Sequence, residues 1–139
     1  MGTRRAGREL ALKLLFQVDI GGASPEEALT SALAATSHKS ETMTFARQLL
    51  EGTLAHRGEI DQMLKKYAKQ WSLERMANVD RCILQLATFE ILYSGEVPDS
   101  VAVDEAVEMA KKYSTAESGR FVNGILGSLL RDNLAQTGD

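Results

Sequence analysis

The stretch Val79–Tyr93, VDRCILQLATFEILY, decides the fold of this 139-residue chain. On a helix with roughly 100° between successive residues, its apolar side chains cover well over half of the circumference. They are Val79, Cys82, Ile83, Leu84, Leu86, Ala87, Phe89, Ile91 and Tyr93. A surface helix has a narrower apolar stripe, so this breadth predicts a helix that other helices surround.

Glu90 lies in the middle of that apolar arc. A buried carboxylate needs a partner or a proton. We therefore expect Glu90 to pair with an arginine or a lysine, or to cap another helix. A catalytic role would need a second acid or base nearby, and the sequence does not point to one.

The residues on either side of this stretch predict an all-α chain, because it has only two prolines and few β-branched runs. We expect about seven helices in one domain, 1–139. Two small helical subdomains, about 1–71 and 72–139, would share a core and meet near Trp71–Asn78. The predicted helices run from the cap Thr3 to about 20, over about 25–35 and 41–56, from the break at Gly58 to about 70, over about 79–93 and 101–113, and from the capping box at Ser114 to about 134, with a single turn at Leu73–Ala77.

Two capping boxes mark helix starts in this pattern. Ser24-Pro25-Glu26-Glu27 places proline at the first helical position, and Ser114-Thr115-Ala116-Glu117 opens the last helix. Asn78 is placed to cap the central helix. Gly21-Gly22 ends the first helix.

Composition excludes several classes of protein. Apolar residues are 44% and charged residues 25%, both typical of a folded globular domain, and the net charge is −3. Cys82 has no partner for an internal disulfide, and His38 and His56 lack metal-ligand spacing, so we expect no metal site. The absence of a long apolar run argues against a membrane span and for a cytoplasmic location.

The first helix carries the most informative surface. Arg4, Arg5 and Arg8 lie within an arc of about 100° at helical spacing, and residues 1–8 contain no acid. Arginine binds phosphate with a planar fork and stacks on bases. Phe16, just past this arc, is placed to stack on an unpaired base. The alternative is a solvated helix end with ordinary arginines.

No pattern in the chain indicates catalysis. Gly119, Gly124 and Gly127 match neither a P-loop nor a dinucleotide fingerprint. No Ser-His-Asp or Cys-His constellation can be assembled. We expect no catalytic residue and no cofactor.

Several motifs, spread in order over essentially the whole chain, resemble the NusB family of transcription antitermination factors. They are Arg4-Arg5-Ala6-Gly7-Arg8-Glu9-Leu10-Ala11, then Val79-Asp80-Arg81 with Ile83–Ala87 and Phe89-Glu90-Ile91-Leu92, then Pro98, Val101 and Asp104–Lys111, and finally Ser118–Leu126. The last two motifs together are specific.

The resemblance implies a non-enzymatic protein that binds boxA single-stranded RNA of ribosomal-RNA leader transcripts together with ribosomal protein NusE. The complex would join elongating RNA polymerase with other Nus factors. By the same resemblance, RNA contacts fall to Arg4, Arg5, Arg8, Phe16, Glu117 and Phe121, and Asp80 matches a position at the RNA or partner surface. Gly7 departs from the family, which usually has alanine there, and Ala6 stands where a further basic residue is common. We therefore expect a lower intrinsic RNA affinity.

Two other functions stay open at this point. The chain could be a protein-interaction scaffold that binds NusE or forms a homodimer, with no direct RNA affinity of its own. It could also be an accessory domain detached from an RNA methyltransferase, although no cofactor pocket is evident.

Overall fold

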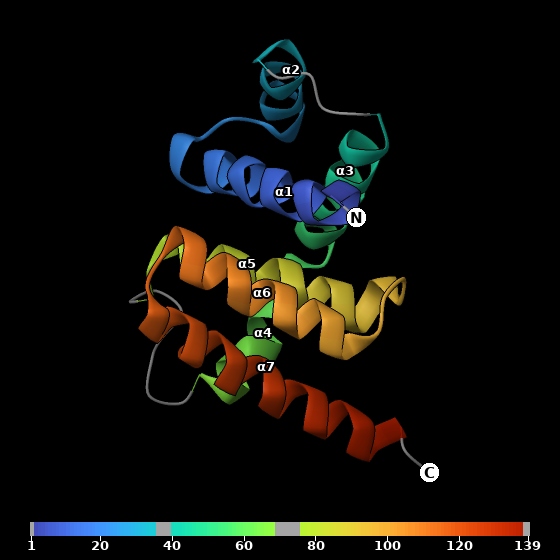
Figure 1. Cartoon of the computed structure of the whole chain (residues 1–139), viewed down its shortest axis with the longest axis vertical. Helices are drawn as coiled ribbons and strands as arrows, with labels where there is room; N and C mark the ends of the chain where they lie inside the picture. The colour runs from blue at the N-terminus through green and yellow to red at the C-terminus, as the bar shows by residue number, and fades with distance from the viewer. Residues whose placement is uncertain (1, 36–39, 69–75, 138–139) are drawn as a thin grey trace. The chain divides into compact units, whose positions relative to one another are not determined.

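The structure, a computed structural model, describes residues 2–35, 40–68 and 76–137 (Figure 1). Within these residues it contains seven α-helices, one π-helical turn and no strand, which confirms the predicted all-α class. The helices are α1 (Gly2–Gly21), α2 (Pro25–Ala35), α3 (Ser40–Ala55), α4 (Arg57–Tyr67), α5 (Asn78–Phe89), α6 (Asp99–Tyr113) and α7 (Ala116–Thr137). The predicted turn at Leu73–Ala77 begins outside the described residues.

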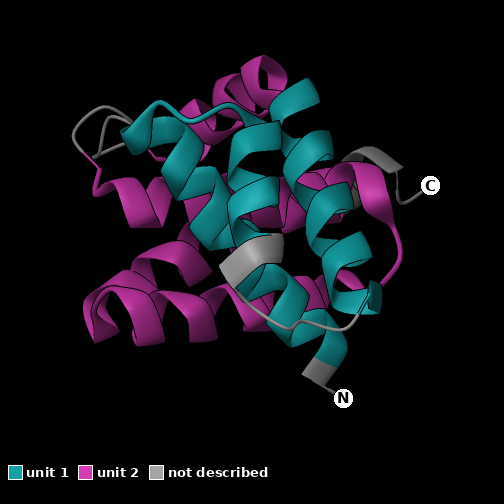
Figure 2. Ribbon diagram, turned by 90° about the horizontal axis from the view of Figure 1, so that it is seen from above, with its two compact units in different colours: residues 1–55 teal, residues 56–139 magenta. Residues whose placement is uncertain are grey.

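The chain forms two compact units, residues 1–55 and 56–139 (Figure 2). Their boundary lies between α3 and α4, earlier than the seam predicted near Trp71–Asn78. Helix α4 belongs to the second unit because it packs against α5 and α7. Most of the predicted seam lies outside the described residues.

In the first unit, α1 packs against α2 and α3. Helix α1 contributes the buried side chains Leu10, Ala11, Leu14 and Leu15 to the core of this unit. Helix α3 contributes Phe45, Ala46, Leu49 and Leu50 to the same core. One face of α1 is therefore packed in the core of this unit, and the arginines lie on a helix that this packing holds in place.

In the second unit, α5 packs against α4, α6 and α7, and α6 runs beside α7 (Figure 1). Every residue from Cys82 to Thr88 is buried. More of the surface of α5 is buried than its apolar arc predicts, because the polar residues Asp80, Gln85 and Thr88 are buried too. Gln85 compensates through Nε2, which donates to Asp61 Oδ1 at 2.8 Å.

The end of the predicted central helix differs from a regular α-helix. From Glu90 to Ser94 the backbone forms a π-helical turn, closed by a 3.3 Å bond from Gly95 N to Glu90 O. Gly95 has φ 65°, a left-handed conformation that ends the turn. Glu90 is buried, as its place in the apolar arc predicts; its pairing stays a prediction.

The helix caps confirm one prediction and correct two. Ser24 and Glu27 form the reciprocal bonds of a capping box, both 3.1 Å, and the bonds from Ser24 lower the pKa of Glu27. The cap of α7 is Thr115 rather than Ser114, because Ser118 N donates to Thr115 Oγ1 at 3.0 Å. Asn78 is the first residue of α5 rather than its cap, and its Oδ1 accepts from Arg81 Nη2 at 2.6 Å.

Candidate nucleic-acid interface

The predicted arginine cluster lies in the first two turns of α1. Arg4 and Arg5 are exposed, whereas Arg8 is only 4% exposed. The Arg4 guanidinium carbon lies 5.1 Å from the centre of the Phe45 ring, and that of Arg8 lies 5.4 Å from the same centre. Both distances are within the range of a cation–π interaction. An aromatic ring from α3 therefore contacts two of the three arginines in the predicted cluster.

Gly7 explains how the ring comes so close to α1. A Cβ built on Gly7 would lie 2.7 Å from Phe45 Cδ2, which no real contact tolerates. Glycine weakens a helix interior relative to alanine, but here it makes room for the ring. Glycine at this position thus accompanies a specific packing contact.

Phe16 lies farther along α1 and is half-buried. Lys13, one turn earlier, is exposed, and Ile20, one turn later, is 50% exposed. The helix therefore presents a basic beginning and a partly apolar end.

The other predicted residues, Asp80, Glu117 and Phe121, line one recess in the second unit with a volume of ≈ 770 Å³. The recess lies where α5 and α7 begin. Its remaining wall comes from Met76, Ala77, Thr115, Ser118 and Arg120. Asp80 of α5 is thereby brought together with Glu117 and Phe121 of α7.

Asp80 has the most defined geometry in this recess. It is 7% exposed, and its Oδ2 accepts a 2.9 Å hydrogen bond from Ser118 Oγ. The Ser118 hydroxyl lies 3.0 Å from both Ser114 Oγ and Thr115 Oγ1. The second oxygen, Asp80 Oδ1, is buried without a hydrogen-bond partner among the described residues. Such an atom is suited to accept a hydrogen bond from a ligand.

Glu117 and Phe121 differ from Asp80 in exposure. Glu117 is exposed in the first turn of α7, where a negative charge is favoured by the helix dipole. Because Thr115 and Ser118 form the cap, Glu117 has no part in it. Phe121 is half-buried one turn later, so part of its ring is available for stacking.

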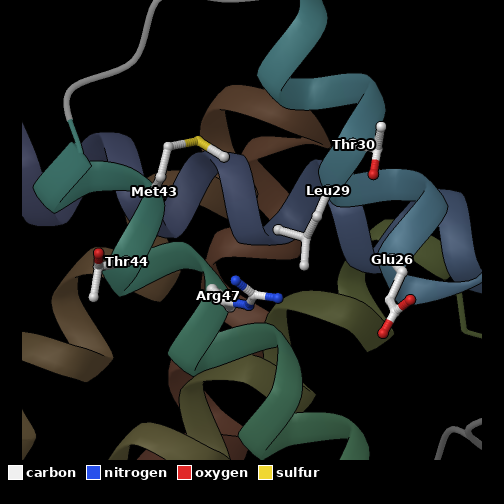
Figure 3. Close-up of a pocket in the computed structure, with 6 residues that line it drawn as sticks. All are labelled: Glu26, Leu29, Thr30, Met43, Thr44 and Arg47. Carbon is white, nitrogen blue, oxygen red and sulfur yellow. The ribbon is translucent and has the colours of Figure 1, made fainter.

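A further recess, of ≈ 390 Å³, lies between α2 and α3 in the first unit (Figure 3). Its lining is Glu26, Leu29, Thr30, Met43, Thr44 and Arg47. None of the predicted site residues is among them. Arg47 is paired on its own helix with Glu51, at 3.2 Å.

The predicted residues thus fall into two sets, one on α1 in the first unit and one at the recess in the second. Phe45, Ser118 and Arg120 were not predicted. Arg120 stands beside Phe121 within a motif already quoted, which is a signal that could have identified it. Ser118 begins the same motif, whereas Phe45 contacts the arginines from another helix, for which the sequence holds no local signal.

No other site type is evident in the part of the chain that the structure describes. No group of three His, Cys, Asp or Glu side chains there could hold a metal ion. None of the helices described has the length and apolar character needed to cross a membrane.

Comparisons with known proteins agree with one another. A sequence model of the NusB family matches residues 5–131. The transcription antitermination protein NusB of Symbiobacterium thermophilum is 51% identical over 93% of this chain and 90% of its own length. T. maritima NusB superposes with a TM-score of 0.84 at 37% identity, covering 92% of this chain and 90% of that structure. A crystal structure of antitermination factors NusB and NusE in complex with dsRNA gives a TM-score of 0.86 at 25% identity, covering 95% and 98%.

Proposed function

The chain belongs to the NusB family of transcription antitermination factors, and on this premise we propose that it binds boxA RNA of ribosomal-RNA leader transcripts together with ribosomal protein NusE. Family membership confirms the predicted identity and makes the chain a transcription factor rather than an enzyme. The RNA-bound complex would then join elongating RNA polymerase with other Nus factors. Such a role on nascent transcripts implies the bacterial cytoplasm.

The observation that carries the proposal is the arginine cluster at the start of α1. Arg4 and Arg5 are exposed, and arginine is the side chain whose planar fork suits phosphate oxygens. Arg8 is buried, with its guanidinium beside Phe45, and we keep the RNA contact predicted for it as part of the proposal. A NusB protein solved with NusE and dsRNA has the same fold, which supports an RNA-binding role for this chain.

The recess in the second unit would read bases. Asp80 Oδ1, buried and without a partner among the described residues, is suited to accept from a base amino group. The half-buried ring of Phe121 is suited to stack on a base. The exposed carboxylate of Glu117 would repel a misplaced phosphate, which favours one RNA over any polyanion.

In this proposal Phe16 is the aromatic residue of α1 that stacks on an unpaired base.

Few phosphate contacts give a modest RNA affinity that depends on salt concentration. A partner bound beside the RNA adds contacts, so protein and NusE together should bind more tightly than either alone.

One observation favours a second candidate function, a protein-interaction scaffold or homodimer without RNA affinity. Ile20 is 50% exposed one turn after the half-buried Phe16 on α1. Apolar surface of this kind also suits a protein partner. Sedimentation with and without RNA separates the two functions, because RNA dissociates a homodimer only where the two surfaces overlap.

A gel-shift titration tests the proposed function. The protein alone, NusE alone and the mixture are titrated against boxA RNA and a scrambled RNA of equal length. We expect weak binding by the protein, tighter binding by the mixture, and a preference for boxA in both cases. Equal affinity for the two RNAs would exclude the recess as a reader of bases, and no binding in any mixture would leave the scaffold function.

A further inference from the structure

Two arginines that lie one helical turn apart contact one aromatic ring. The guanidinium carbons of Arg4 and Arg8 are 5.1 and 5.4 Å from the centre of Phe45. Like charges at this spacing on a helix repel each other. The negative face of an aromatic ring attracts both, and so offsets part of that repulsion.

The Phe45 ring is buried and packs closely against α1. Phe45 is 7% exposed in the core of the first unit, and its Cδ2 would lie 2.7 Å from a Cβ on Gly7. Gly7 lies between the two arginines in α1. A ring enclosed in this way has little freedom to move, since packed cores leave few voids.

A fixed ring has a consequence for an exposed arginine. A free arginine side chain samples many rotamers, and ordering it on binding reduces affinity. Arg4 keeps its side chain exposed while its guanidinium lies over the ring. The side chain is therefore partly ordered before any ligand arrives.

We propose that Phe45 is a positioning residue of the RNA surface, and that its ring, seated on Gly7, holds the guanidinium groups of Arg4 and Arg8 ready for RNA. This inference rests on the proposed function. It adds a residue from α3 that touches no RNA itself. It also gives a role to the glycine that departs from the family pattern.

A double-mutant cycle tests whether Phe45 acts through Arg4. The variants are Phe45→Leu, Arg4→Ala and the pair, titrated with boxA RNA in the presence of NusE. We expect Phe45→Leu to weaken binding about two- to fivefold, and its effect to fall below about twofold when Arg4 is already alanine. The same factor in both backgrounds would overturn the proposal.

A measurement without RNA tests the ring contact separately. In the free protein, the Nε–Hε resonances of Arg4 and Arg8 should carry a ring-current shift that Phe45→Leu removes and Phe45→Tyr retains. Unchanged resonances in Phe45→Leu would overturn the proposed contact between the Phe45 ring and the two arginines. Absence of RNA binding by the unaltered protein would instead overturn the proposed function, whatever the resonances show.

A matched control separates positioning from loss of stability. Leu49→Ala removes a buried side chain one turn later on α3, and we expect it to lower the free energy of unfolding without changing RNA affinity. If Phe45→Leu is too unstable to titrate, Gly7→Ala displaces the ring instead and should weaken RNA binding by a similar factor. Unaltered RNA affinity in Gly7→Ala, with a displaced ring, would overturn the proposal.

Discussion

Ser118 Oγ donates a 2.9 Å hydrogen bond to Asp80 Oδ2, and this bond joins the first turn of α7 to the first turn of α5. The two residues are 38 positions apart in sequence. Asp80 is buried, and its other oxygen has no hydrogen-bond partner among the described residues. Ser118 is thus the hydrogen-bond donor that fixes the orientation of the Asp80 carboxylate in the recess.

Replacing Ser118 with alanine should destabilise the protein. Asp80 would lose the hydrogen bond at Oδ2 while staying buried, which costs about 1–3 kcal/mol. Urea unfolding measures the change. Ser128→Ala is the control on the same helix, since Ser128 Oγ accepts from the exposed Arg131, and we expect a change within about 0.5 kcal/mol. Equal effects of the two variants would show that the Asp80–Ser118 bond does not stabilise the fold.

The position of the α7 cap makes a second prediction. Thr115→Ala removes the hydroxyl that accepts from Ser118 N, and should lower the free energy of unfolding by about 0.5–2 kcal/mol. Glu117→Ala should leave it within about 0.5 kcal/mol, because Glu117 is exposed and outside the cap. Thermal unfolding followed by circular dichroism compares the two. The opposite order would restore the Ser114–Glu117 capping box that the sequence predicts.

Gly7→Ala reverses the usual effect of adding alanine to a helix. Alanine normally stabilises a helix interior by about 0.5–1 kcal/mol over glycine, but at Gly7 the new Cβ would meet Phe45 at 2.7 Å. Overpacking of this kind costs about 1–3 kcal/mol, so the net change should be destabilising. Gly124→Ala in α7 is the control: its Cβ meets nothing within 4 Å, and it should be stabilising. Stabilisation by both variants would refute the contact with Phe45.

The thiol of Cys82 predicts a dependence of stability on pH. Burial raises its pKa from 9.0 to about 11, and the charges of Arg57 and Arg81 only partly oppose this. The folded pKa lies above the unfolded one, so the stabilising contribution is complete below about pH 9 and is lost as the pH rises through about 11. The loss is on the order of 2–3 kcal/mol for a shift of this size.

Cys82→Ala provides the comparison for that prediction. The cavity that this substitution leaves lowers the free energy of unfolding at every pH. Between pH 9 and 11, however, the variant should lose less stability than the unaltered protein. Urea unfolding at three pH values in this window measures the difference. The thiol should also resist alkylation at pH 8 until the protein unfolds. Parallel stability curves for the two proteins would contradict the raised pKa.

The sequence predicts those parts of the fold that depend on local signals. The bounds of α2 follow from Ser24 and Glu27, whose capping box forms as expected. The burial of Cys82, Ile83, Leu84, Leu86 and Ala87 follows from the broad apolar arc of this helix, whereas the burial of Gln85 does not. The family resemblance, which rests on motifs spread along the chain, is confirmed by relatives that match nearly its whole length.

Other features depend on contacts between helices, and the sequence pattern does not contain them. Ser114 and Thr115 are both residue types that can cap α7, and in the structure it is Thr115 Oγ1 that accepts the hydrogen bond from Ser118 N. The π-helical turn at Glu90–Ser94 accompanies stacking of Tyr93 on His56, with ring centres 3.9 Å apart. Phe45 has the periodicity of an ordinary core residue, and only the close approach of α3 to Gly7 brings it beneath the arginines.

The measurement that tests the central claim most directly is the salt dependence of boxA binding for the unaltered protein and for Arg4→Ala/Arg5→Ala, each with NusE. Both arginines are exposed, so circular dichroism should stay helical in the variant. Loss of two phosphate contacts should weaken binding and reduce the slope of log affinity against log salt by about 1.4. Arg47→Ala, which removes an exposed charge from α3 of the same unit, should change neither. An unaltered affinity and slope in the double variant would contradict the assignment of RNA binding to the start of α1.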